Sequence, residues 1–249
     1  MRILLSGASG FMGKEVIKLC ENNYKDCQIV CGVDAFSKGE EKFPCYKSFN
    51  EVDISFDCIV DFSHHLVTKD LLEYAVKVKK PIVLATTGHT QEEKELIFNA
   101  GKQTPIFYSA NMSIGVSLLV ELAKKTALAM DGADIEIIEK HHNRKVDAPS
   151  GTALMIFDAI KSVREKANAV MGRSGQSKRV DSNEIGIHSL RMGNVVGEHE
   201  VIVSTANQTI TLKHEAHNRA LFAEGALTAT SYIVKQSSGI YTMQDMLKD

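Results

Sequence analysis

The sequence of 249 residues predicts an α/β protein: a Rossmann-like, doubly wound parallel sheet domain plus a smaller α+β domain with a mixed, largely antiparallel sheet. Three observations lead to this prediction. Over roughly the first hundred residues, apolar β-branched runs alternate with helical stretches, which is typical of a parallel sheet covered on both faces. A glycine-rich turn follows the first of these runs. After residue 133 the strand-like segments instead alternate apolar with polar residues, which is typical of a sheet with one polar face.

The first domain is predicted to comprise residues 1–112 and 219–249 and to bind a dinucleotide. Apolar runs bounded by Gly, Pro or Ser predict strands at 2–7, 28–34, 57–63, 81–88 and 105–110. Apolar residues at helical spacing predict helices at 13–22, 66–79, 91–100 and 220–236, the last packing back on this domain. Parallel sheets bind ligands outside the carboxyl ends of their strands, so we expect the cofactor site there.

Residues 113–218 are predicted to form the second, smaller domain. Its helices are expected at 113–130 and 152–166, and its alternating strands at 134–142, 184–192, 198–206 and 208–216. Residues 168–183, rich in Gly, Ser, Arg and Lys, predict one long mobile loop.

Composition limits the classes of function. A formal net charge of −2 provides no global basic field for nucleic acid or an anionic membrane, so neither is expected as a partner. Five cysteines fall within the first 58 residues without a C-x-x-C pair, which argues against a disulfide framework and a zinc site and favours a reducing cytoplasm. The N-terminal apolar run is too short for a signal peptide, and the longest uncharged stretch, 103–120, contains a proline and several polar residues, unlike a membrane span. We therefore expect a cytoplasmic protein with a small-molecule partner.

The glycine turn "GASGFMG" places Gly7, Gly10 and Gly13 between the first strand and the first helix. A helix start offers unpaired N–H groups to a pyrophosphate, and glycines allow its close approach. The spacing is G-x-x-G-x-x-G rather than G-x-G-x-x-G, so the turn alone is only moderately specific. Asp34 ends the second strand, where a dinucleotide fold places the acid that binds the ribose hydroxyls. The alternative is an ordinary glycine turn with a solvated aspartate.

The residues after Asp34 bear on the choice of cofactor. Ala35 follows it directly, so nothing there neutralises a ribose 2′-phosphate, which favours NADH over NADPH. Lys38 is close enough to act as a mobile charge for that phosphate, so NADPH stays open. The segments "TTG" (86–88) and "SANM" (109–112) end later strands and are expected near the nicotinamide half, although either could be ordinary loop punctuation.

The segment "EKHHNRKVDAPSGTA" (139–153) concentrates positive charge before a predicted helix. His141 and His142 end an alternating strand and point to opposite faces, so joint metal ligation is disfavoured and no metal is expected. Histidine and Lys145 beside a helix start suit a dicarboxylate substrate and a proton donor. The groups expected to bind a carboxylate at that helix start are Ser150, Gly151 and Thr152. The plainer alternative is one exposed histidine and one core histidine.

Three other basic residues have open interpretations. Arg219, before the last helix, either completes a carboxylate clamp or is solvated. His64 and His65 follow "DFS" at a strand end and could simply begin the next helix.

In order and spacing, "GASGFMG", "DFS", "ATTG", "SANMSIG" and above all "EKHHNRKVDAPSGTA" resemble the 4-hydroxy-tetrahydrodipicolinate reductase family, also called dihydrodipicolinate reductases. The resemblance runs essentially end to end, through "SGIYTMQDML". It implies NAD(P)H-dependent reduction of a cyclic, conjugated imine dicarboxylate in lysine and diaminopimelate biosynthesis, with loss of water from the hydroxylated precursor. It also implies that residues 113–218 are the substrate-binding and oligomerisation domain, with a homotetramer built through its sheet.

The resemblance assigns roles to individual residues. It makes His141 the general acid and Lys145 a second proton donor or charge stabiliser, and it implies carboxylate contacts from His142, Gly151, Thr152 and Arg219. The implied cofactor contacts are Gly7, Ala8, Ser9, Gly10, Phe11, Met12, Asp34, Ala85, Thr86, Thr87, Ser109, Ala110, Asn111 and Met112.

This chain also departs from the family pattern. Some members carry arginine where it has Phe11 and Ala35, which puts tight NADPH binding in doubt, and Met112 replaces a common phenylalanine. Two rival interpretations are another two-domain amino-acid dehydrogenase, which would lack the "KVDAPSGT" block, and a non-catalytic dinucleotide sensor, which would not need His141 and Lys145.

Overall fold

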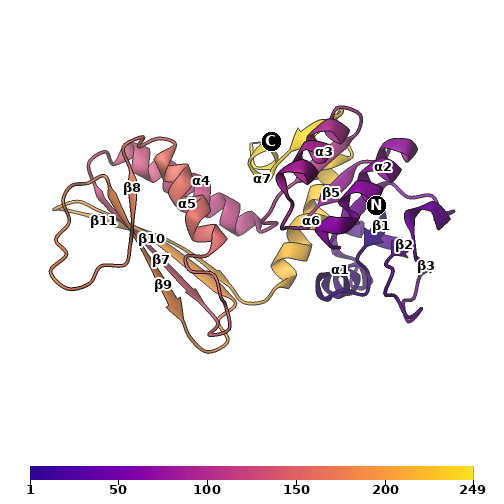
Figure 1. Cartoon of the computed structure of the whole chain (residues 1–249), viewed down its shortest axis with the longest axis horizontal. Coiled ribbons are helices and arrows are strands. Elements are labelled where there is room, and N and C mark those ends of the chain that lie inside the picture. Colours follow the sequence, from indigo (N-terminus) through magenta and orange to yellow (C-terminus); the bar gives the residue numbers. More distant parts are fainter. Residues whose placement is uncertain (249) are drawn as a thin grey trace. The chain divides into compact units, whose positions relative to one another are not determined.

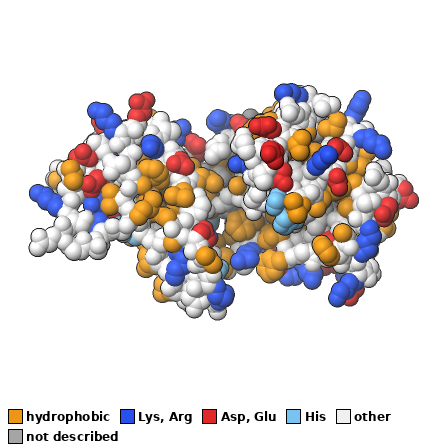
Figure 2. Space-filling view, in the orientation of Figure 1, with side chains coloured by type: hydrophobic (Ala, Val, Ile, Leu, Met, Phe, Trp, Pro, Cys, Tyr) orange, Lys and Arg blue, Asp and Glu red, His pale blue; other side chains and the backbone are white. Residues whose placement is uncertain are grey.

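The computed structural model describes residues 1–248 and divides the chain into two compact units (Figure 1). The first unit comprises Met1–Ser113 and Arg219–Asp249, and the second comprises Ile114–Asn218. Each unit has its own sheet and its own buried apolar core. On the face shown in Figure 2, acidic and basic side chains are interspersed over both units.

The sheet of the first unit is entirely parallel. Its strands are β1 (Arg2–Ser6), β2 (Gln28–Val33), β3 (Cys45–Tyr46), β4 (Cys58–Asp61), β5 (Ile82–Leu84), β6 (Pro105–Tyr108) and β12 (Gly239–Tyr241). They lie in the order β12-β6-β5-β4-β1-β2-β3. The strand order therefore reverses between β1 and β4, and the crevice outside the strand ends at such a point is where this class of fold binds ligands.

Helices cover both faces of this sheet. They are α1 (Phe11–Glu21), α2 (Thr68–Val78), α3 (Gln91–Gly101), α6 (Ala220–Ile233) and α7 (Met243–Met246), with 3-10 turns at Tyr24–Asp26, Phe49–Glu51 and His65–Val67. Leu4 and Ile59 join the core that packs against α2 and α3, while their neighbours Leu5 and Val60 point to the opposite face and are also fully buried. The predicted doubly wound sheet is thus confirmed, and the short strands β3 and β12 are additions to it.

The second unit has a mixed sheet, as predicted. Its strands are β7 (Asp134–His141), β8 (Asn168–Met171), β9 (Glu184–Arg191), β10 (Gly197–Ser204) and β11 (Thr209–Ala216), in the order β11-β10-β7-β9-β8. The strand β10 is antiparallel to both of its neighbours, whereas β9 is parallel to both of its own, so the sheet is less antiparallel than expected. The reason is a crossover: after β7 the chain passes through a helix before it returns as β8 in the same direction.

Two helices cover one face of this second sheet: α4 (Ile114–Ala129) and α5 (Gly151–Lys161). Their apolar residues pack on the inward positions of β7, such as Ile135 and Ile137. The helix predicted to run to residue 166 ends at Lys161. Arg164 lies beyond this end, and its guanidinium donates to the carbonyls of Ala127 and Ala133 at 3.1 and 2.8 Å, which holds the chain in another direction.

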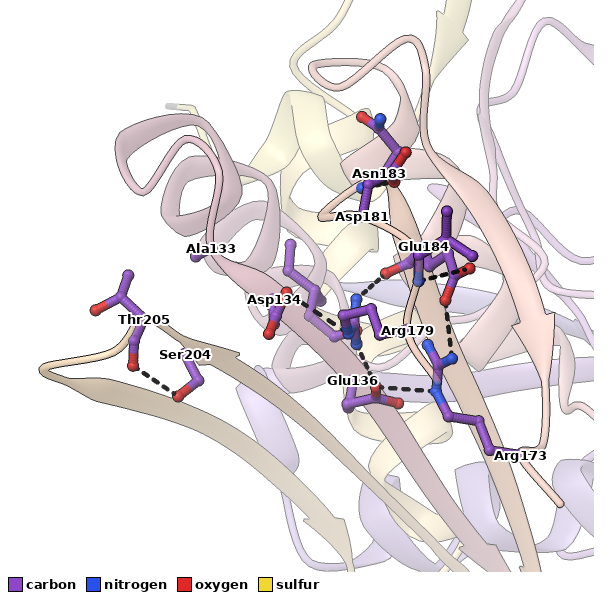
Figure 3. Close-up of polar contacts among 12 residues, drawn as sticks. Ala133, Asp134, Glu136, Arg173, Arg179, Asp181, Asn183, Glu184, Ser204 and Thr205 are labelled. Atoms are coloured by element: carbon purple, nitrogen blue, oxygen red, sulfur yellow. Dashed lines mark hydrogen bonds and ion pairs between the residues drawn. The ribbon is translucent and has the colours of Figure 1, made fainter. Parts of the chain in front are cut away.

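The segment expected as a loop from residue 168 begins instead with a strand. The four residues of β8 pair with β9, which is too short a run to stand out in the sequence. The rest of the segment is fastened by ion pairs (Figure 3): Arg173 contacts Glu184 at 2.8 Å, and Arg179 binds Glu136 on β7. Among the residues described, no helix is both long and apolar enough to cross a membrane.

Candidate active site

The glycine turn between β1 and α1 has the backbone that a dinucleotide requires. Gly7 has a φ of +80°, and a Cβ there would lie 2.6 Å from the carbonyl oxygen of Phe62. A Cβ at Gly13 would lie 2.2 Å from the Gly7 carbonyl oxygen, so a side chain would force the helix off the turn. Gly10 is the N-cap of α1 and no side chain caps this helix, which leaves its first N–H groups for a ligand.

Asp34, after β2, is joined to this turn through Ser9. One carboxylate oxygen accepts the Ser9 N–H at 2.9 Å and the Ser9 hydroxyl at 2.5 Å, and the other accepts the Phe36 N–H at 2.8 Å. Burial raises the pKa of Asp34, but these hydrogen bonds outweigh it and the net pKa lies below the ordinary value. An ionised carboxylate therefore lines a cavity of about 560 Å³ together with Gly7, Ser9 and Gly10. This cradle fits the adenosine and pyrophosphate half of a dinucleotide.

Two lysines line this cavity, Lys47 and Lys77, and the sequence reasoning missed Lys47, which lies close enough to Asp34 to lower its pKa. The Nζ of Lys47 donates to the carbonyl oxygen of Ala35 at 3.2 Å and to that of Ser37. Lys38 lines a neighbouring groove rather than this cavity. Lys47 is brought here by the short strand β3, which pairs with β2, and nothing in the local sequence marks that pairing.

A second cavity, of about 280 Å³, collects expected cofactor contacts from three segments. It is lined by Met12, Ala85, Thr86, Thr87, Ala110 and Met112, and also by Phe62, Ser63 and Phe222. Ser109 and Asn111 shape the turn after β6, because the Ser109 hydroxyl donates to the Asn111 carbonyl at 2.7 Å. Ala8 is fully buried beneath the glycine turn.

The edge of this second cavity is held by Asp61, another residue that the sequence reasoning did not identify. Its carboxylate accepts the hydroxyls of Ser63 and Thr86, each at 2.6 Å, and so ties the end of β4 to the end of β5. Asp61 is almost completely buried, and burial raises its pKa. The "DFS" motif marked the strand end but not this role.

In the second unit, His141 ends β7 beside a buried carboxylate. Its Nδ1 lies 2.5 Å from Oε2 of Glu139, two residues earlier on the same face of the strand. Arg191 donates to both oxygens of Glu139, at 2.9 and 2.7 Å, and the backbone N–H of Ser150 donates at 3.1 Å. Burial raises the pKa of Glu139, but the hydrogen bonds from His141 and Arg191 reverse the shift, and the net pKa lies well below the ordinary range.

The start of α5 faces open space. Ser150 is its N-cap and accepts the Ala153 N–H at 3.2 Å, while a Cβ at Gly151 would meet nothing within 4 Å. Thr152 follows in the first turn of this helix. Helix starts of this kind bind anions through their N–H groups.

The turn between β7 and α5 carries the remaining basic residues. The N–H of Lys145 donates to the carbonyl of His142 at 3.1 Å, and the Lys145 ammonium pairs with Asp147 at 2.7 Å. A cis peptide joins Ala148 to Pro149 just before the helix. Basic side chains and an open helix start therefore belong to one short segment.

Arg219, the last residue expected to contact the substrate, belongs to the first unit. Its guanidinium lies over the ring of Phe11, 5.4 Å from the centroid, next to the glycine turn. Its contact with a substrate carboxylate stays a prediction. No group of three or more His, Cys, Asp or Glu suited to a metal ion occurs within residues 1–248.

Sequence reasoning also missed three residues around His141: Glu139, Arg191 and His199. The sequence did carry a signal for Glu139, because it follows Ile135 and Ile137 at every second position and so belongs to the core-facing side of the strand. In the structure its side chain is completely buried. Arg191 comes from β9, where sheet pairing sets it beside His141. His199 packs its ring against that of His141, with the centroids 5.2 Å apart.

The fold and the glycine turn define a dinucleotide-dependent oxidoreductase with a Rossmann-type sheet. The particular family follows from comparison with known proteins. Residues 1–112 match the family model described as dihydrodipicolinate reductase, N-terminus, and residues 115–247 match the model for its C-terminus. The chain therefore belongs to the dihydrodipicolinate reductase family, which confirms the resemblance seen in its motifs.

Relatives with curated names cover the whole chain. A 4-hydroxy-tetrahydrodipicolinate reductase from Caldanaerobacter subterraneus is 45% identical over 100% of this chain and 98% of its own. One from Clostridium novyi is 45% identical over 99% and 98%. Among solved structures, a dipicolinate-bound dihydrodipicolinate reductase from a Paenisporosarcina species superposes with a TM-score of 0.83 at 22% identity, over 99% of both chains, and shares the fold.

Proposed function

We propose that this chain catalyses the NAD(P)H-dependent reduction of 4-hydroxy-tetrahydrodipicolinate to tetrahydrodipicolinate in lysine and diaminopimelate biosynthesis. The observation that carries the proposal is the arrangement of His141, held 2.5 Å from a buried carboxylate, with the open start of α5 attached to the same carboxylate through Ser150. This arrangement suits proton donation to an anionic substrate, and the relatives named above bear the name of this reaction.

The residues assigned to the substrate, all from the second unit except Arg219, have distinct roles in this proposal. The first N–H groups of α5, at Gly151 and Thr152, bind one substrate carboxylate, and His142 and Arg219 contribute to carboxylate binding. The reduced nicotinamide supplies the hydride. Loss of the hydroxyl group as water converts the precursor to a conjugated imine. Hydride addition to this imine places negative charge at the far end of the conjugated system, where protonated His141 delivers a proton. The Lys145 ammonium stabilises that charge as it develops.

The same proposal assigns the dinucleotide to the first unit, with NADH preferred to NADPH. The glycine turn and the start of α1 bind the pyrophosphate, and the Asp34 carboxylate accepts the ribose hydroxyls. An ionised Asp34 repels a 2′-phosphate. Lys47, which donates to two backbone carbonyls near Asp34, offsets this repulsion only in part.

The assembly that we propose is a homotetramer formed through the sheet of the second unit, in the cytoplasm. The face of this sheet turned away from α4 and α5 includes Ile138, Leu190 and Ile202 among polar neighbours. Such a mixed surface suits an interface between copies. All five cysteines are unpaired thiols, which suits a reducing compartment. Light scattering at micromolar protein concentration tests the assembly, because it distinguishes about 27 kDa from four times that mass.

A coupled assay tests the reaction. The substrate is generated from pyruvate and aspartate semialdehyde by the preceding synthase, and the loss of reduced-nicotinamide absorbance is followed with NADH and NADPH separately. Rapid oxidation that requires the synthase supports the proposal. No oxidation with either cofactor, despite measured NADH binding, would favour a dinucleotide sensor instead.

A further inference from the structure

Glu139 is a charged residue in a position where charge is costly. It continues the core-facing series Ile135 and Ile137 along β7, and its side chain is 0% exposed. A buried carboxylate costs several kcal/mol unless it is fully paired, so its presence indicates that it does something a nonpolar residue cannot. Packing alone would favour another isoleucine there.

We propose that Glu139 is the positioning residue of the proton donor, holding His141 in the tautomer that exposes Nε2. The inference rests on the proposed function, because it concerns the donor of that reaction. An ionised carboxylate can only accept, so the contact of 2.5 Å requires a proton on Nδ1 of His141. Nε2 is then the nitrogen that gives up a proton and takes one back.

Both oxygens of Glu139 are fixed. Oε1 accepts from Arg191 at 2.7 Å and from the Ser150 N–H at 3.1 Å, while Oε2 accepts from Arg191 at 2.9 Å and from His141. A two-pronged arginine contact sets the plane of a carboxylate as well as its position. Since Ser150 also caps α5, one carboxylate fixes both the proton donor and the carboxylate-binding helix start.

The other side of the imidazole is kept open by a glycine. A Cβ at Gly197 on β10 would lie 3.2 Å from Nε2 of His141, so a larger residue there would crowd the nitrogen that transfers the proton. His199 meets the ring edge to face and limits its tilt. Glu139 thus sets which nitrogen is exposed, and Gly197 leaves room in front of it.

The proton balance is simple. Protonated His141 releases the Nε2 proton to the substrate carbon at the far end of the conjugated system and becomes neutral. Its other proton stays on Nδ1, hydrogen-bonded to Glu139. A proton from water then restores Nε2. The negative charge of Glu139 stabilises the protonated ring before transfer. The charged and titratable groups around this ring are Glu139 on β7, Arg191 on β9, His199 on β10 and, in the turn before α5, Lys145 and Asp147.

The opposite face of β7 provides a matched control. There Glu136 contacts His188 at 2.7 Å and binds Arg179, so it is also a glutamate with a histidine and an arginine partner (Figure 3 shows the glutamate and the arginine). Replacing Glu136 removes the same charge from the same strand without touching His141. A loss of activity that both variants share would therefore come from disturbance of the sheet and not from the proton donor.

The experiment compares Glu139→Gln with Glu136→Gln in steady-state kinetics from pH 5.5 to 9. Glutamine keeps the shape of the side chain, but its amide can donate as well as accept, so it no longer selects the Nδ1–H tautomer of His141. We expect kcat of Glu139→Gln to fall at least about tenfold at pH 8 while KM changes much less, and Glu136→Gln to keep the wild-type kcat and KM. An unchanged kcat in Glu139→Gln, or an equal loss of kcat in both variants, would overturn the inference.

A measurement on the wild-type enzyme covers the case in which Glu139→Gln fails to fold. Nitrogen-15 NMR of histidine-labelled protein at pH 8, with the His141 signal assigned by its loss in His141→Gln, should show the Nδ1–H tautomer. An Nε2–H tautomer would overturn the inference. The two proposals fail separately: an inactive wild type with the Nδ1–H tautomer rejects the reaction, whereas an active enzyme with an Nε2–H tautomer rejects only the role of Glu139.

Discussion

The hydroxyl of Ser150 lies 3.0 Å from Nε2 of His199, so a hydrogen bond joins the N-cap of α5 to β10. Ser150 Oγ accepts the Ala153 N–H, and its own proton is available for donation to a neutral His199. His199 is 4% exposed, and burial, with a smaller contribution from nearby His141, lowers its pKa to about 4. Protonation would bury a positive charge beside this helix start.

This contact predicts a loss of stability in mild acid. The unfolded chain binds a proton at His199 below about pH 6.5 and the folded chain only below about pH 4, so the free energy of unfolding should fall as the pH drops through that window. Across this window, His199 should lower the free energy of unfolding by about 3 kcal/mol. In urea unfolding, the free energy of unfolding of His199→Gln should decline less steeply than that of the wild type from pH 6.5 to 4. Identical slopes for the two proteins would contradict the assignment.

His141→Gln should separate chemistry from cofactor binding. Glutamine can still accept or donate a hydrogen bond but carries no transferable proton at neutral pH, so turnover should fall about 100-fold or more. The NADH dissociation constant, measured by fluorescence titration, should stay within about twofold, because the residues assigned to the dinucleotide belong to the first unit. An equal loss of cofactor affinity would mean that His141 is structural.

Asp34→Ala should do the opposite. Its carboxylate accepts both the N–H and the hydroxyl of Ser9 beside the glycine turn, and the ribose hydroxyls lose their acceptor without it. NADH binding should weaken about tenfold or more, while KM for the dicarboxylate changes little. Calorimetric titration with NADH provides the test, and an unchanged dissociation constant would remove Asp34 from the site.

Lys47 should control how much NADPH the enzyme tolerates. Two lysines, Lys47 and Lys77, line the cavity containing Asp34, and Lys47 is the one whose charge lowers the pKa of that carboxyl. Lys47→Met should therefore lower the specificity constant for NADPH about tenfold more than that for NADH. Lys38→Met is the control, because Lys38 lines a neighbouring groove and should leave the ratio unchanged. If Lys47→Met lowered both constants equally, the lysine would only brace the carbonyls of Ala35 and Ser37.

The features that the sequence predicted are those with local causes. The strand, glycine turn and helix at residues 2–21 follow from apolar runs and from Gly7 and Gly13, where any side chain would clash. The start of α5 follows from a serine followed by glycine in "PSGTA". Each of these signals lies within a few residues of the structure that it specifies.

The features that escaped prediction depend on pairing between distant segments. Arg191 reaches Glu139 because β9 pairs with β7 in a register that sets it beside His141, 50 positions along the chain. Lys47 reaches the cavity that contains Asp34 because it follows the two-residue strand β3. The strand β8 has only four residues, too few for a clear strand pattern in the sequence. The alternation of side chains along β7 could have placed Glu139 on the core-facing side of the strand. Its partner Arg191, however, depends on how β9 pairs with β7, which the local sequence does not show.

The most direct test of the central claim follows the hydride itself. The enzyme is given synthase-generated substrate and NADH deuterated at both hydrogens of the reactive carbon, and the product is analysed by mass spectrometry. The account predicts tetrahydrodipicolinate carrying one deuterium, formed by the wild-type protein and at least about 100-fold more slowly by His141→Gln. Absence of deuterated product from a wild-type protein that binds NADH would contradict it.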